Sequence, residues 1–390
     1  MSSLPTLAIT LGDPCGIGPE ILLKALPQLT YQARVVIIGS RAGVELLSKS
    51  KNNSQRWLWG TPPFMIGGQY ETFGFYLNDP QNASQMHSAL WIDPYPLSMN
   101  SLQMGIPSRL SGKSSIESLT TATKLMMDHR ADALVTLPIS KSSVMASQET
   151  FTGHTEYLER ASGSKYTQMI FMSPNMKVAL HTVHMSLKTV TEHMDEESLF
   201  NTIQFSVGSF VEMIGTSYLN VAVAALNPHA GEQGAFGKEE TIISSAIKRS
   251  IKELSENSFH YNKEKFGVSI YSKHKPSKPW TPYPQQEIKI RQKPLRIVGP
   301  LSGDSVFRKM YEGDFDLTIA MYHDQGLIPI KLVEPILAVN VTFGLPFVRT
   351  SPDHGTGFDI AGLGDADHRN FLEASRLALR LLRRSKGYFE

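Results

Sequence analysis

His184, His229 and His323 each stand shortly after an apolar run that predicts a buried strand. Because α/β proteins place their binding sites at the carboxyl ends of strands, we expect these three side chains to lie near one edge of a sheet. A structural role is the more common one for any single histidine. Three at one edge favour a shared divalent metal ion, and neutral imidazoles that leave a coordination position open suit zinc, cobalt or a similar Lewis acid.

A second set of residues has the chemistry to bind an anionic substrate: His154, Thr155, Lys331, Asn340 and Arg349. The two cations Lys331 and Arg349 suit a carboxylate or a phosphate, and the arginine offers bidentate geometry. Thr155 and Asn340 would add neutral hydrogen bonds. The alternative stays open at this point: the two cations are rim charges, and Thr155 belongs to a helix start.

A glycine-rich turn, Gly-Asp-Pro-Cys-Gly-Ile-Gly-Pro-Glu over residues 12–20, separates a predicted strand from a predicted helix. Glycines allow close approach to the backbone, and a helix start offers free N–H groups to a phosphate or pyrophosphate. The turn differs from the Gly-x-Gly-x-x-Gly of the common dinucleotide fold, so a plain helix start is the open alternative. The predicted cofactor residues here are Gly12, Asp13, Gly16 and Gly18.

A second glycine-rich segment, residues 351–362, has the composition of a loop that wraps an adenine and a ribose. A carboxylate in it would accept hydrogen bonds from the ribose hydroxyls. A turn-rich connection without a ligand is compatible with the same spacing. The predicted cofactor residues of this segment are Asp353, His354, Gly355, Thr356 and Asp359.

The elements that must position these residues alternate between strand and helix. Apolar runs at 7–11, 34–38, 133–137, 177–181, 220–225, 295–298 and 317–321 predict buried strands, and helical spacing recurs over 115–129 and 239–251. This alternation predicts an α/β fold with a largely parallel sheet covered by helices. Residues 50–110 predict irregular structure with a few short strands, and residues 253–293 predict a surface insertion.

Length and composition narrow the function classes. The chain has 390 residues, of which 41% are hydrophobic and 19% are charged, and this predicts a globular protein of two domains. A net charge of +2 is too small for the positive field of a nucleic-acid protein. With one cysteine, Cys15, no intrachain disulfide is possible. The sequence also has no run that resembles a signal peptide or a membrane-spanning helix, so we expect a cytoplasmic protein without a membrane partner.

Five motifs in a fixed order carry a resemblance to the 4-hydroxythreonine-4-phosphate dehydrogenase family, NAD-dependent enzymes of pyridoxal phosphate biosynthesis. They are the turn at residues 12–20, Gly-His-Thr-Glu, Asn-Pro-His-Ala-Gly-Glu, Tyr-His-Asp-Gln-Gly-Leu and Asp-His-Gly-Thr-Gly-Phe-Asp-Ile-Ala-Gly. The similarity runs from Leu7 to about Leu382. The first and last motifs also resemble elements of isopropylmalate and isocitrate dehydrogenases. A longer 253–293 stretch and Cys15 in place of a small alanine depart from the family pattern.

The resemblance implies a two-domain fold of the isocitrate/isopropylmalate dehydrogenase type, with mostly parallel sheets and helices on both faces. It places a discontinuous cofactor domain at residues 1–130 and 333–390 and a metal and dimer domain at 131–332. The active site would lie in the interdomain cleft at a homodimer interface, with His323 supplied by the second subunit.

Carried over residue by residue, the resemblance makes His184, His229 and His323 the ligands of one zinc, magnesium or cobalt ion. His154, Thr155, Lys331, Asn340 and Arg349 become the substrate contacts, with Lys331 the candidate for proton transfer. The implied reaction is the NAD- or NADP-dependent oxidation of 4-phosphohydroxy-L-threonine, followed by decarboxylation to 3-amino-2-oxopropyl phosphate. The alternatives are a dehydrogenase of threonate or erythronate 4-phosphate and, in another class, a phosphate acetyltransferase.

Overall fold

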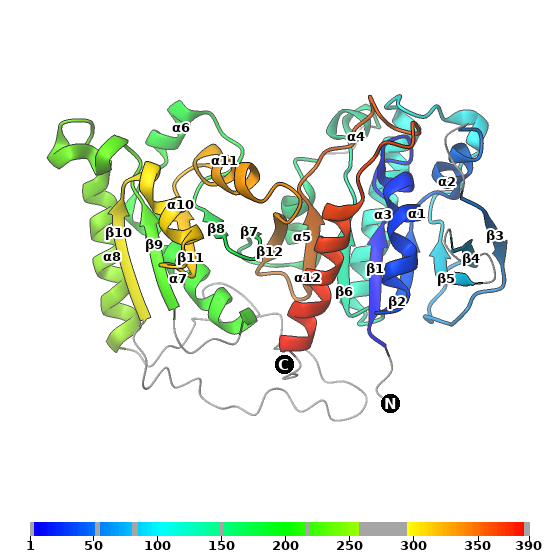
Figure 1. Cartoon of the computed structure of the whole chain (residues 1–390), viewed down its shortest axis with the longest axis horizontal. Coiled ribbons are helices and arrows are strands. Elements are labelled where there is room, and N and C mark those ends of the chain that lie inside the picture. Colours follow the sequence, from blue (N-terminus) through cyan, green and yellow to red (C-terminus); the bar gives the residue numbers. More distant parts are fainter. Residues whose placement is uncertain are drawn as a thin grey trace. The chain divides into compact units, whose positions relative to one another are not determined.

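The computed structural model of the chain describes residues 4–50, 55–79, 85–147, 151–214, 219–256 and 295–385. It contains two compact units, Met1–Gly163 with Phe347–Leu382 and Ser164–Pro346 with Arg383–Glu390. Each unit has an α/β structure with strands and helices of its own (Figure 1).

The first unit is built on a mixed sheet whose strands follow the order β13-β6-β1-β2-β5-β4-β3. The strands from β13 to β5 pair in parallel, whereas β5, β4 and β3 pair antiparallel. β1 and β6 are buried along their whole length, as the apolar runs predict. The bounds are β1 Thr6–Thr10, β2 Arg34–Ile38, β3 Trp57–Gly60, β4 Thr72–Asn78, β5 Met86–Ile92, β6 Ala133–Thr136 and β13 Val348–Pro352.

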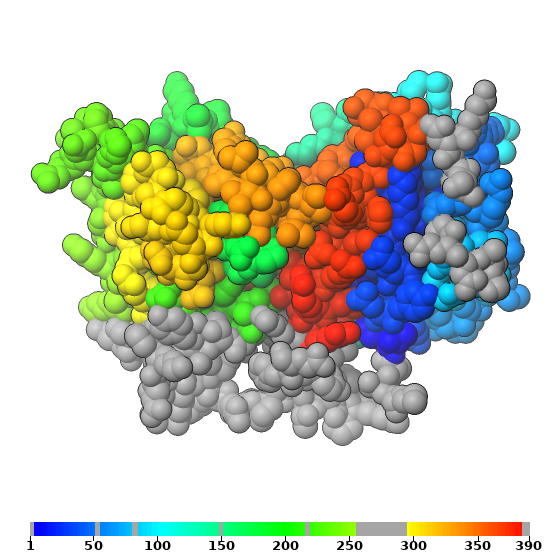
Figure 2. Space-filling view, viewed as in Figure 1, coloured from blue at the N-terminus to red at the C-terminus, as the bar shows by residue number. Residues whose placement is uncertain are grey.

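Helices of the first unit present apolar faces to this sheet or to each other. α3 (Arg109–Met127) contacts β1, β2 and β6, and its start is closed by a capping box between Ser108 and Ser111. α12 (Arg369–Ser385) lies beside α1 (Gly18–Leu29), and the Arg376 guanidinium donates to Gln28 at 3.0 Å across that contact (Figure 2). The other helices are α2 Arg41–Leu47, η1 Met99–Ser101, α4 Lys141–Ala146 and α5 His154–Ser162.

The second unit has the strand order β10-β9-β11-β8-β7-β12. β10, β9, β11 and β8 pair in parallel, and β7 pairs antiparallel with both β8 and β12. The strands are β7 Gln168–Met172, β8 Lys177–Leu180, β9 Leu219–Ala224, β10 Leu295–Leu301, β11 Leu317–Ala320 and β12 Val339–Phe343. The helices are α6 Leu187–Glu192, α7 Glu196–Ile214, η2 Pro228–Gly234, α8 Glu239–Glu256, α10 Gly303–Tyr311 and α11 His323–Val333.

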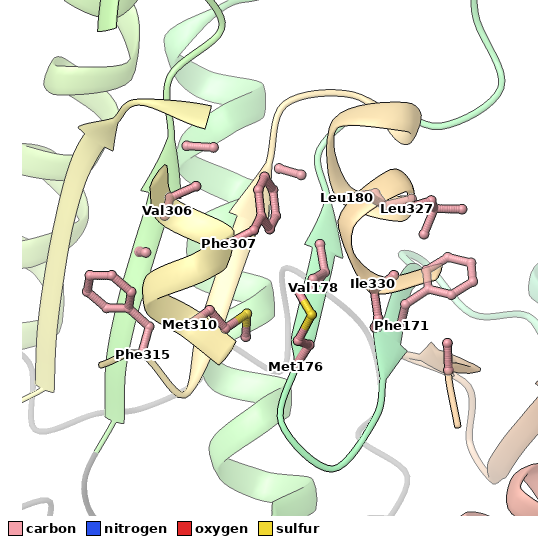
Figure 3. Close-up of a cluster of buried hydrophobic side chains, with 14 residues drawn as sticks. Phe171, Met176, Val178, Leu180, Val306, Phe307, Met310, Phe315, Leu327 and Ile330 are labelled. Atoms are coloured by element: carbon pink, nitrogen blue, oxygen red, sulfur yellow. The ribbon is translucent and has the colours of Figure 1, made fainter. Parts of the chain in front are cut away.

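Two of these helices close one core of the second unit. Val306, Phe307 and Met310 of α10 and Leu327 and Ile330 of α11 belong to one cluster of buried side chains (Figure 3). The cluster is completed by strand residues that include Phe171, Val178 and Leu180. Because α11 begins at His323, this packing holds the start of the helix at the carboxyl end of β11.

The predicted strands are confirmed with ends shifted by a few residues, and so are the two predicted helices. The region 50–110 contains more regular structure than the sequence suggests. β5 in particular pairs in parallel with β2, and its last four residues, which form an apolar run, are buried. Among the described strands, parallel pairs outnumber antiparallel ones, and the presence of both makes the strand pairing mixed.

The unit boundaries lie later in the chain than the sequence suggests. β6, α4 and α5 fall in the first unit, because β6 pairs in parallel with β1 and with β13. The predicted insertion at 253–293 lies outside the described residues, apart from Glu253–Glu256 at the end of α8. Among the residues described, no helix combines the length and apolar character that a membrane crossing needs.

Candidate functional site

The glycine-rich turn before α1 is packed into the first unit. A side-chain carbon at Gly12 would lie 2.2 Å from the carbonyl oxygen of Pro138, and one at Gly18 would lie 2.2 Å from that of Leu11. No larger residue fits at such distances. The two glycines therefore serve close backbone packing of the turn against the strand ends of the unit.

Asp13 organises the same turn from inside. Its carboxylate accepts hydrogen bonds from the backbone N–H of Cys15 at 3.0 Å and from the Ser111 hydroxyl at 3.1 Å. Burial raises the pKa of Asp13, and the hydrogen bonds from Cys15 and Ser111 oppose the rise. The N–H of Gly16 donates to the Asp13 carbonyl at 3.0 Å. These predicted cofactor residues thus shape the turn through contacts with the protein itself.

The segment 353–359 offers more accessible groups. Gly355 and Asp359 are exposed, and Thr356 accepts the backbone N–H of Ile17 through its carbonyl at 2.9 Å. His354 donates through Nδ1 to the Gly355 carbonyl at 3.0 Å, while its buried Nε2 has no hydrogen-bond partner among the described residues. Burial lowers the pKa of His354, so the ring is neutral. A neutral ring with one unpartnered nitrogen can hydrogen-bond a cofactor.

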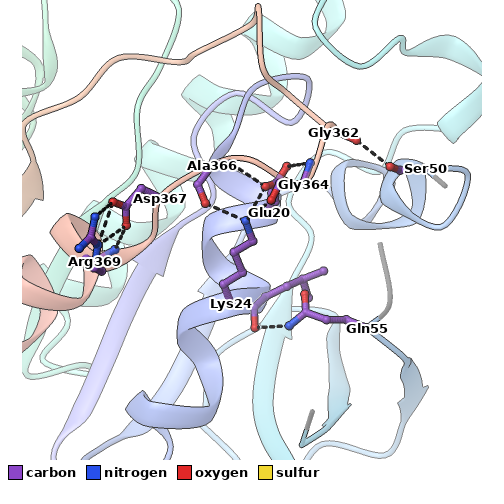
Figure 4. A network of polar contacts seen from close by, with 10 residues as sticks. Glu20, Lys24, Ser50, Gln55, Gly362, Gly364, Ala366, Asp367 and Arg369 are labelled. Carbon is purple, nitrogen blue, oxygen red and sulfur yellow. Dashed lines mark hydrogen bonds and ion pairs between the residues drawn. The ribbon is translucent and has the colours of Figure 1, made fainter. Parts of the chain in front are cut away.

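A polar clamp fastens the end of this segment to α1 (Figure 4). The Glu20 carboxylate accepts the N–H groups of Ala366 at 2.8 Å and Gly364 at 3.2 Å. The Lys24 ammonium pairs with Glu20 at 2.8 Å and donates to the carbonyls of Gly364 at 2.7 Å and Ala366 at 2.8 Å. Nearby, the Ser50 hydroxyl donates to the Gly362 carbonyl. Glu20 is the last residue of the glycine-rich turn at 12–20. The clamp therefore connects this turn to the chain that follows the second glycine-rich segment.

Arg349 is the most deeply buried of the predicted substrate residues. It lies on β13, only 2% exposed, and its Nε and Nη2 both donate to the Thr136 hydroxyl oxygen, at 3.2 and 2.6 Å. Burial lowers the pKa of Arg349 to about 9, and the Glu156 carboxylate opposes this fall. A buried cation with an oriented guanidinium is a preorganised site for an anion.

His154 and Thr155 begin α5 in the same unit. Thr155 is buried, and the His154 ring stands edge-on to Phe151 with centroids 5.6 Å apart. The pKa of His154 is held well below its usual value, first by burial and then by the positive charges of Arg349 and Lys141. His154 is therefore neutral. The structure thus places His154 close enough to Arg349 for the two charges to interact, with Thr155 next to His154 in α5.

Two of the predicted metal ligands lie together in the second unit. The rings of His184 and His323 have centroids 5.9 Å apart. The loops after β8 and β11, which carry these histidines, lie side by side. The backbone N–H and the hydroxyl of Thr182 both donate to the Met321 carbonyl. His323 Nδ1 contacts the Asp324 carboxylate at 2.7 Å, which orients the ring and leaves Nε2 for a metal ion.

The resemblance assigns His323 to a second subunit, whereas here its ring is already a neighbour of His184 in the same chain. Gln325 strengthens this arrangement: it accepts the N–H of Met321 at 2.7 Å and donates to the Ala225 carbonyl at 2.7 Å. It therefore joins the carboxyl ends of β11 and β9. Within the described part of a single chain, no three His, Cys, Asp or Glu side chains converge as a metal site.

His229 stands in an unusual backbone turn after β9. Residues 229–233 all have positive φ, between 41° and 75°, and four of the five are not glycine. Such left-handed conformations cost energy for L-residues, so the surroundings must hold them. The carboxylate of Glu240, at the start of α8, accepts two hydrogen bonds from Asn227. One comes from the backbone N–H at 2.8 Å and the other from the side-chain amide N–H at 3.0 Å. The carboxylate also lies 2.5 Å from where a side chain at Gly231 would begin.

The remaining predicted residues lie elsewhere in the second unit. Lys331 is exposed in the last turn of α11. Asn340 lies on β12 opposite Phe171, and its buried Oδ1 has no hydrogen-bond partner among the described residues. An unpartnered buried amide oxygen is a candidate acceptor for a substrate donor.

The residues predicted from the sequence do not include Thr136, Lys141, Glu240 or Gln325. A signal was available for Lys141 and Thr136, because both stand at or just after the end of a predicted strand, as the histidines do. No comparable signal marks Glu240, whose role depends on a turn that only the tertiary structure shows.

The family model for the pyridoxal phosphate biosynthetic protein PdxA matches residues 61–260 and 286–378. A 4-hydroxythreonine-4-phosphate dehydrogenase of Sulfurihydrogenibium sp. is 38% identical over 97% of this chain and 98% of its own length. A D-threonate 4-phosphate dehydrogenase of Cupriavidus necator is 30% identical over 98% of each chain.

A solved structure shares the fold over nearly its full length. The 4-hydroxythreonine-4-phosphate dehydrogenase of Klebsiella pneumoniae superposes with a TM-score of 0.69 at 28% identity, covering 98% of this chain and 100% of that one.

Proposed function

Since this chain belongs to the PdxA family of pyridoxal phosphate biosynthetic proteins, and is therefore a dehydrogenase, we propose that it oxidises 4-phosphohydroxy-L-threonine with NAD or NADP and a divalent metal ion. The observation that carries the choice of a phosphorylated substrate is the cluster of Arg349, Thr136 and His154. A buried guanidinium beside a neutral imidazole suits an anionic group of a small substrate.

The proposed reaction has two stages. The C3 hydroxyl of the substrate loses its proton and a hydride passes to the nicotinamide, which produces 2-amino-3-oxo-4-phosphobutanoate. This β-keto acid then loses CO2 and takes up a proton, which gives 3-amino-2-oxopropyl phosphate. A divalent ion bound by the histidines supplies a Lewis acid that favours ionisation of the hydroxyl and loss of CO2.

The residues of the chain have separate tasks in this proposal. Arg349, His154 and Thr155 bind an anionic group of the substrate. Lys331 and Asn340 are further proposed substrate contacts, and Lys331 is the candidate for moving a proton because an ammonium can donate and, once neutral, accept. The segment 353–359 is the proposed cofactor loop, together with the turn of Gly12, Asp13, Gly16 and Gly18.

We propose a homodimer that shares the metal site, with His184, His229 and His323 as the ligands. One feature supports the metal site and another supports the dimer. His184 and His323 already form a close pair of imidazoles with an oriented ring, which fits two metal ligands. In addition, α11, which begins at His323, exposes Ile328, Leu332 and Val333 at 63%, 80% and 45%. Neighbouring exposed apolar side chains of this kind mark protein interfaces, and a second copy of the chain is the occupant we propose.

D-threonate 4-phosphate is the second candidate substrate, because relatives of that name are 30–31% identical over nearly the whole chain. It differs from the first candidate in bearing a hydroxyl where 4-phosphohydroxy-L-threonine bears an amino group. The higher identity of 38% to a 4-hydroxythreonine-4-phosphate dehydrogenase supports the first.

The test is the reduction of NAD and of NADP with each substrate, followed by the absorbance of the reduced nicotinamide at about 340 nm. It is measured before chelation, after chelation and after the metal is restored. Turnover of 4-phosphohydroxy-L-threonine that a chelator abolishes and added metal restores would support the proposal. A much larger kcat/KM with D-threonate 4-phosphate would replace the substrate. Full activity in metal-free protein would remove the metal from the proposal.

A further inference from the structure

Three charged side chains gather near the carboxyl end of β6 in the first unit. Arg349 lies on β13, Glu156 in the first turn of α5, and Lys141 is the first residue of α4. β6 and β13 are parallel neighbours with Leu134 opposite Arg349, so the loop that leaves β6 passes the Arg349 side chain. The bond from Arg349 to Thr136, the last residue of β6, fixes this arrangement.

The charges of this cluster do not balance. Arg349 and Lys141 carry two positive charges, whereas Glu156 carries one negative charge. His154 adds no charge, because burial and the two cations hold its pKa well below the usual value. A surplus of positive charge around a buried imidazole is unfavourable by itself, and a bound anion would relieve it.

Lys141 differs from Arg349 in what surrounds it. The Lys141 side chain is exposed, whereas Arg349 is 2% exposed and hydrogen-bonded to Thr136. In the part of the chain that the structure describes, no carboxylate pairs with the Lys141 ammonium. His154 Nε2 is buried and likewise lacks a hydrogen-bond partner there. The cluster thus contains a cation and a ring nitrogen that are both available to a ligand.

The backbone that carries Lys141 is held firmly. The Ser140 hydroxyl accepts the N–H of Ser143 at 3.1 Å, which caps the start of α4. A side-chain carbon at Gly112 of α3 would lie 2.1 Å from the Ser143 carbonyl oxygen, so α3 and α4 are in backbone contact. The Cα of Lys141 is therefore fixed relative to the sheet, and only its side chain remains adjustable.

We propose that Lys141 forms a direct ion pair with the phosphate group of the substrate, in a position that it shares with His154 and Arg349. This inference rests on the proposed function and adds a contact that the sequence motifs did not reveal. A phosphate monoester carries about −1.5 to −2 charges at neutral pH, which matches the surplus of cations better than a carboxylate does. An ammonium on a flexible stem can bind such a group as a point charge, and His154 in its Nε2–H form can donate to a second oxygen.

The experiment compares inorganic phosphate binding in the wild-type protein and in Lys141→Met, Lys141→Arg and Lys124→Met by isothermal titration calorimetry. Lys124 is the matched control, since it is also exposed in the first unit but stands in the last turn of α3, before β6 begins and so at the opposite edge of the sheet. Acetate is the probe for a carboxylate site. Circular dichroism checks that each variant is folded.

We expect Lys141→Met to weaken phosphate binding and to raise the KM for the phosphorylated substrate by about 10- to 100-fold each, the range for a lost charge-assisted hydrogen bond, with kcat changed much less. Lys141→Arg should retain part of the affinity, and Lys124→Met all of it. Equal phosphate binding by wild type and Lys141→Met would overturn the proposal, and so would a loss of kcat with unchanged phosphate binding and KM, or tighter binding of acetate than of phosphate.

The phosphate titration separates this inference from the proposed function. If the wild-type protein turns over neither phosphorylated substrate but binds phosphate in a manner that depends on Lys141, the anion site stands and the reaction assignment fails. If it turns over a substrate and Lys141→Met behaves as wild type, the reaction stands and the role of Lys141 is refuted.

Discussion

The Arg349 guanidinium places two of its N–H groups on one oxygen, the Thr136 hydroxyl, at 2.6 and 3.2 Å. The two residues lie on adjacent parallel strands, and both are almost inaccessible to solvent. Thr136 therefore decides the direction in which the guanidinium plane points.

Replacing Thr136 with valine keeps the shape of the side chain and removes the acceptor. Two donors of a buried cation would then lack their partner, so we expect a loss of about 1.5–3 kcal/mol in the free energy of unfolding and a higher substrate KM. Thr136→Ser retains the oxygen and should behave nearly as wild type. Urea unfolding and steady-state kinetics measure the two effects. A valine variant with wild-type stability and KM would show that the hydroxyl does not position Arg349.

The Glu20 clamp should govern the cofactor side. Glu20→Gln replaces one acceptor oxygen with a donor that meets the N–H groups of Gly364 and Ala366, and it removes the charge that pairs with Lys24. Because the clamp fastens the chain just after the predicted cofactor loop, we expect the KM for NAD to rise several-fold while the substrate KM stays unchanged. Stability should fall by about 1–2 kcal/mol.

The matched control for this clamp is Glu117→Gln, which breaks the half-exposed pair of Lys113 and Glu117 at 3.1 Å on α3. An exposed pair of this kind contributes little to stability. Unchanged NAD kinetics in Glu20→Gln, or an equal effect in Glu117→Gln, would separate the clamp from cofactor binding.

Glu240 should act on metal binding through the left-handed turn that carries His229. Glu240→Gln keeps the size of the side chain but weakens its hold on Asn227, so the strained turn can relax. We expect metal affinity to fall about tenfold, in the range found for residues that orient a ligand. Titration of the metal-free protein with Co²⁺, followed by absorbance, measures this affinity without turnover. Glu253→Gln, on the same helix and half-exposed, is the control. Equal Co²⁺ affinity in all three proteins would contradict the role of Glu240.

We expect His181 to make the protein less stable in acid. Its Nδ1 contacts the Thr202 hydroxyl at 2.8 Å, and burial lowers the pKa of His181 to about 4, with a small opposing effect of Asp195. Between pH 6.5 and 4 the unfolded chain binds the proton and the folded chain does not, so stability present above pH 6.5 is lost as the pH falls. The loss approaches about 3 kcal/mol near pH 4.

His181→Asn keeps a polar group near Thr202 and removes the titration. Urea unfolding is measured at about pH 7.5 and about pH 5. The free energy of unfolding should differ less between the two pH values for this variant than for the wild type. His129→Asn is the control, because His129 is exposed and has a φ of 56°, which asparagine tolerates. The same pH difference in His181→Asn and in wild type would assign the acid sensitivity to other groups.

The sequence by itself determined the α/β class, the main strands and the residue types of the site. Buried parallel strands require continuous apolar runs, and residues that follow such runs lie at one edge of a sheet, so His184 and His323 were identifiable from local pattern. Arg349 was proposed from its residue type alone. The pairing of β6 with both β1 and β13, which sets the unit boundary, was not identifiable, because strand order depends on contacts between distant segments.

Only the tertiary structure decided how the site residues are held. Thr136 meets Arg349 across 213 positions of sequence, and Gln325 reaches the Ala225 carbonyl across 100. The left-handed turn at His229 has no sequence signature, since four of its five residues are types that disfavour positive φ and are kept there by Glu240. Local pattern selects the chemistry of a side chain, whereas its orientation, burial and charge state depend on neighbours that folding brings from far along the chain.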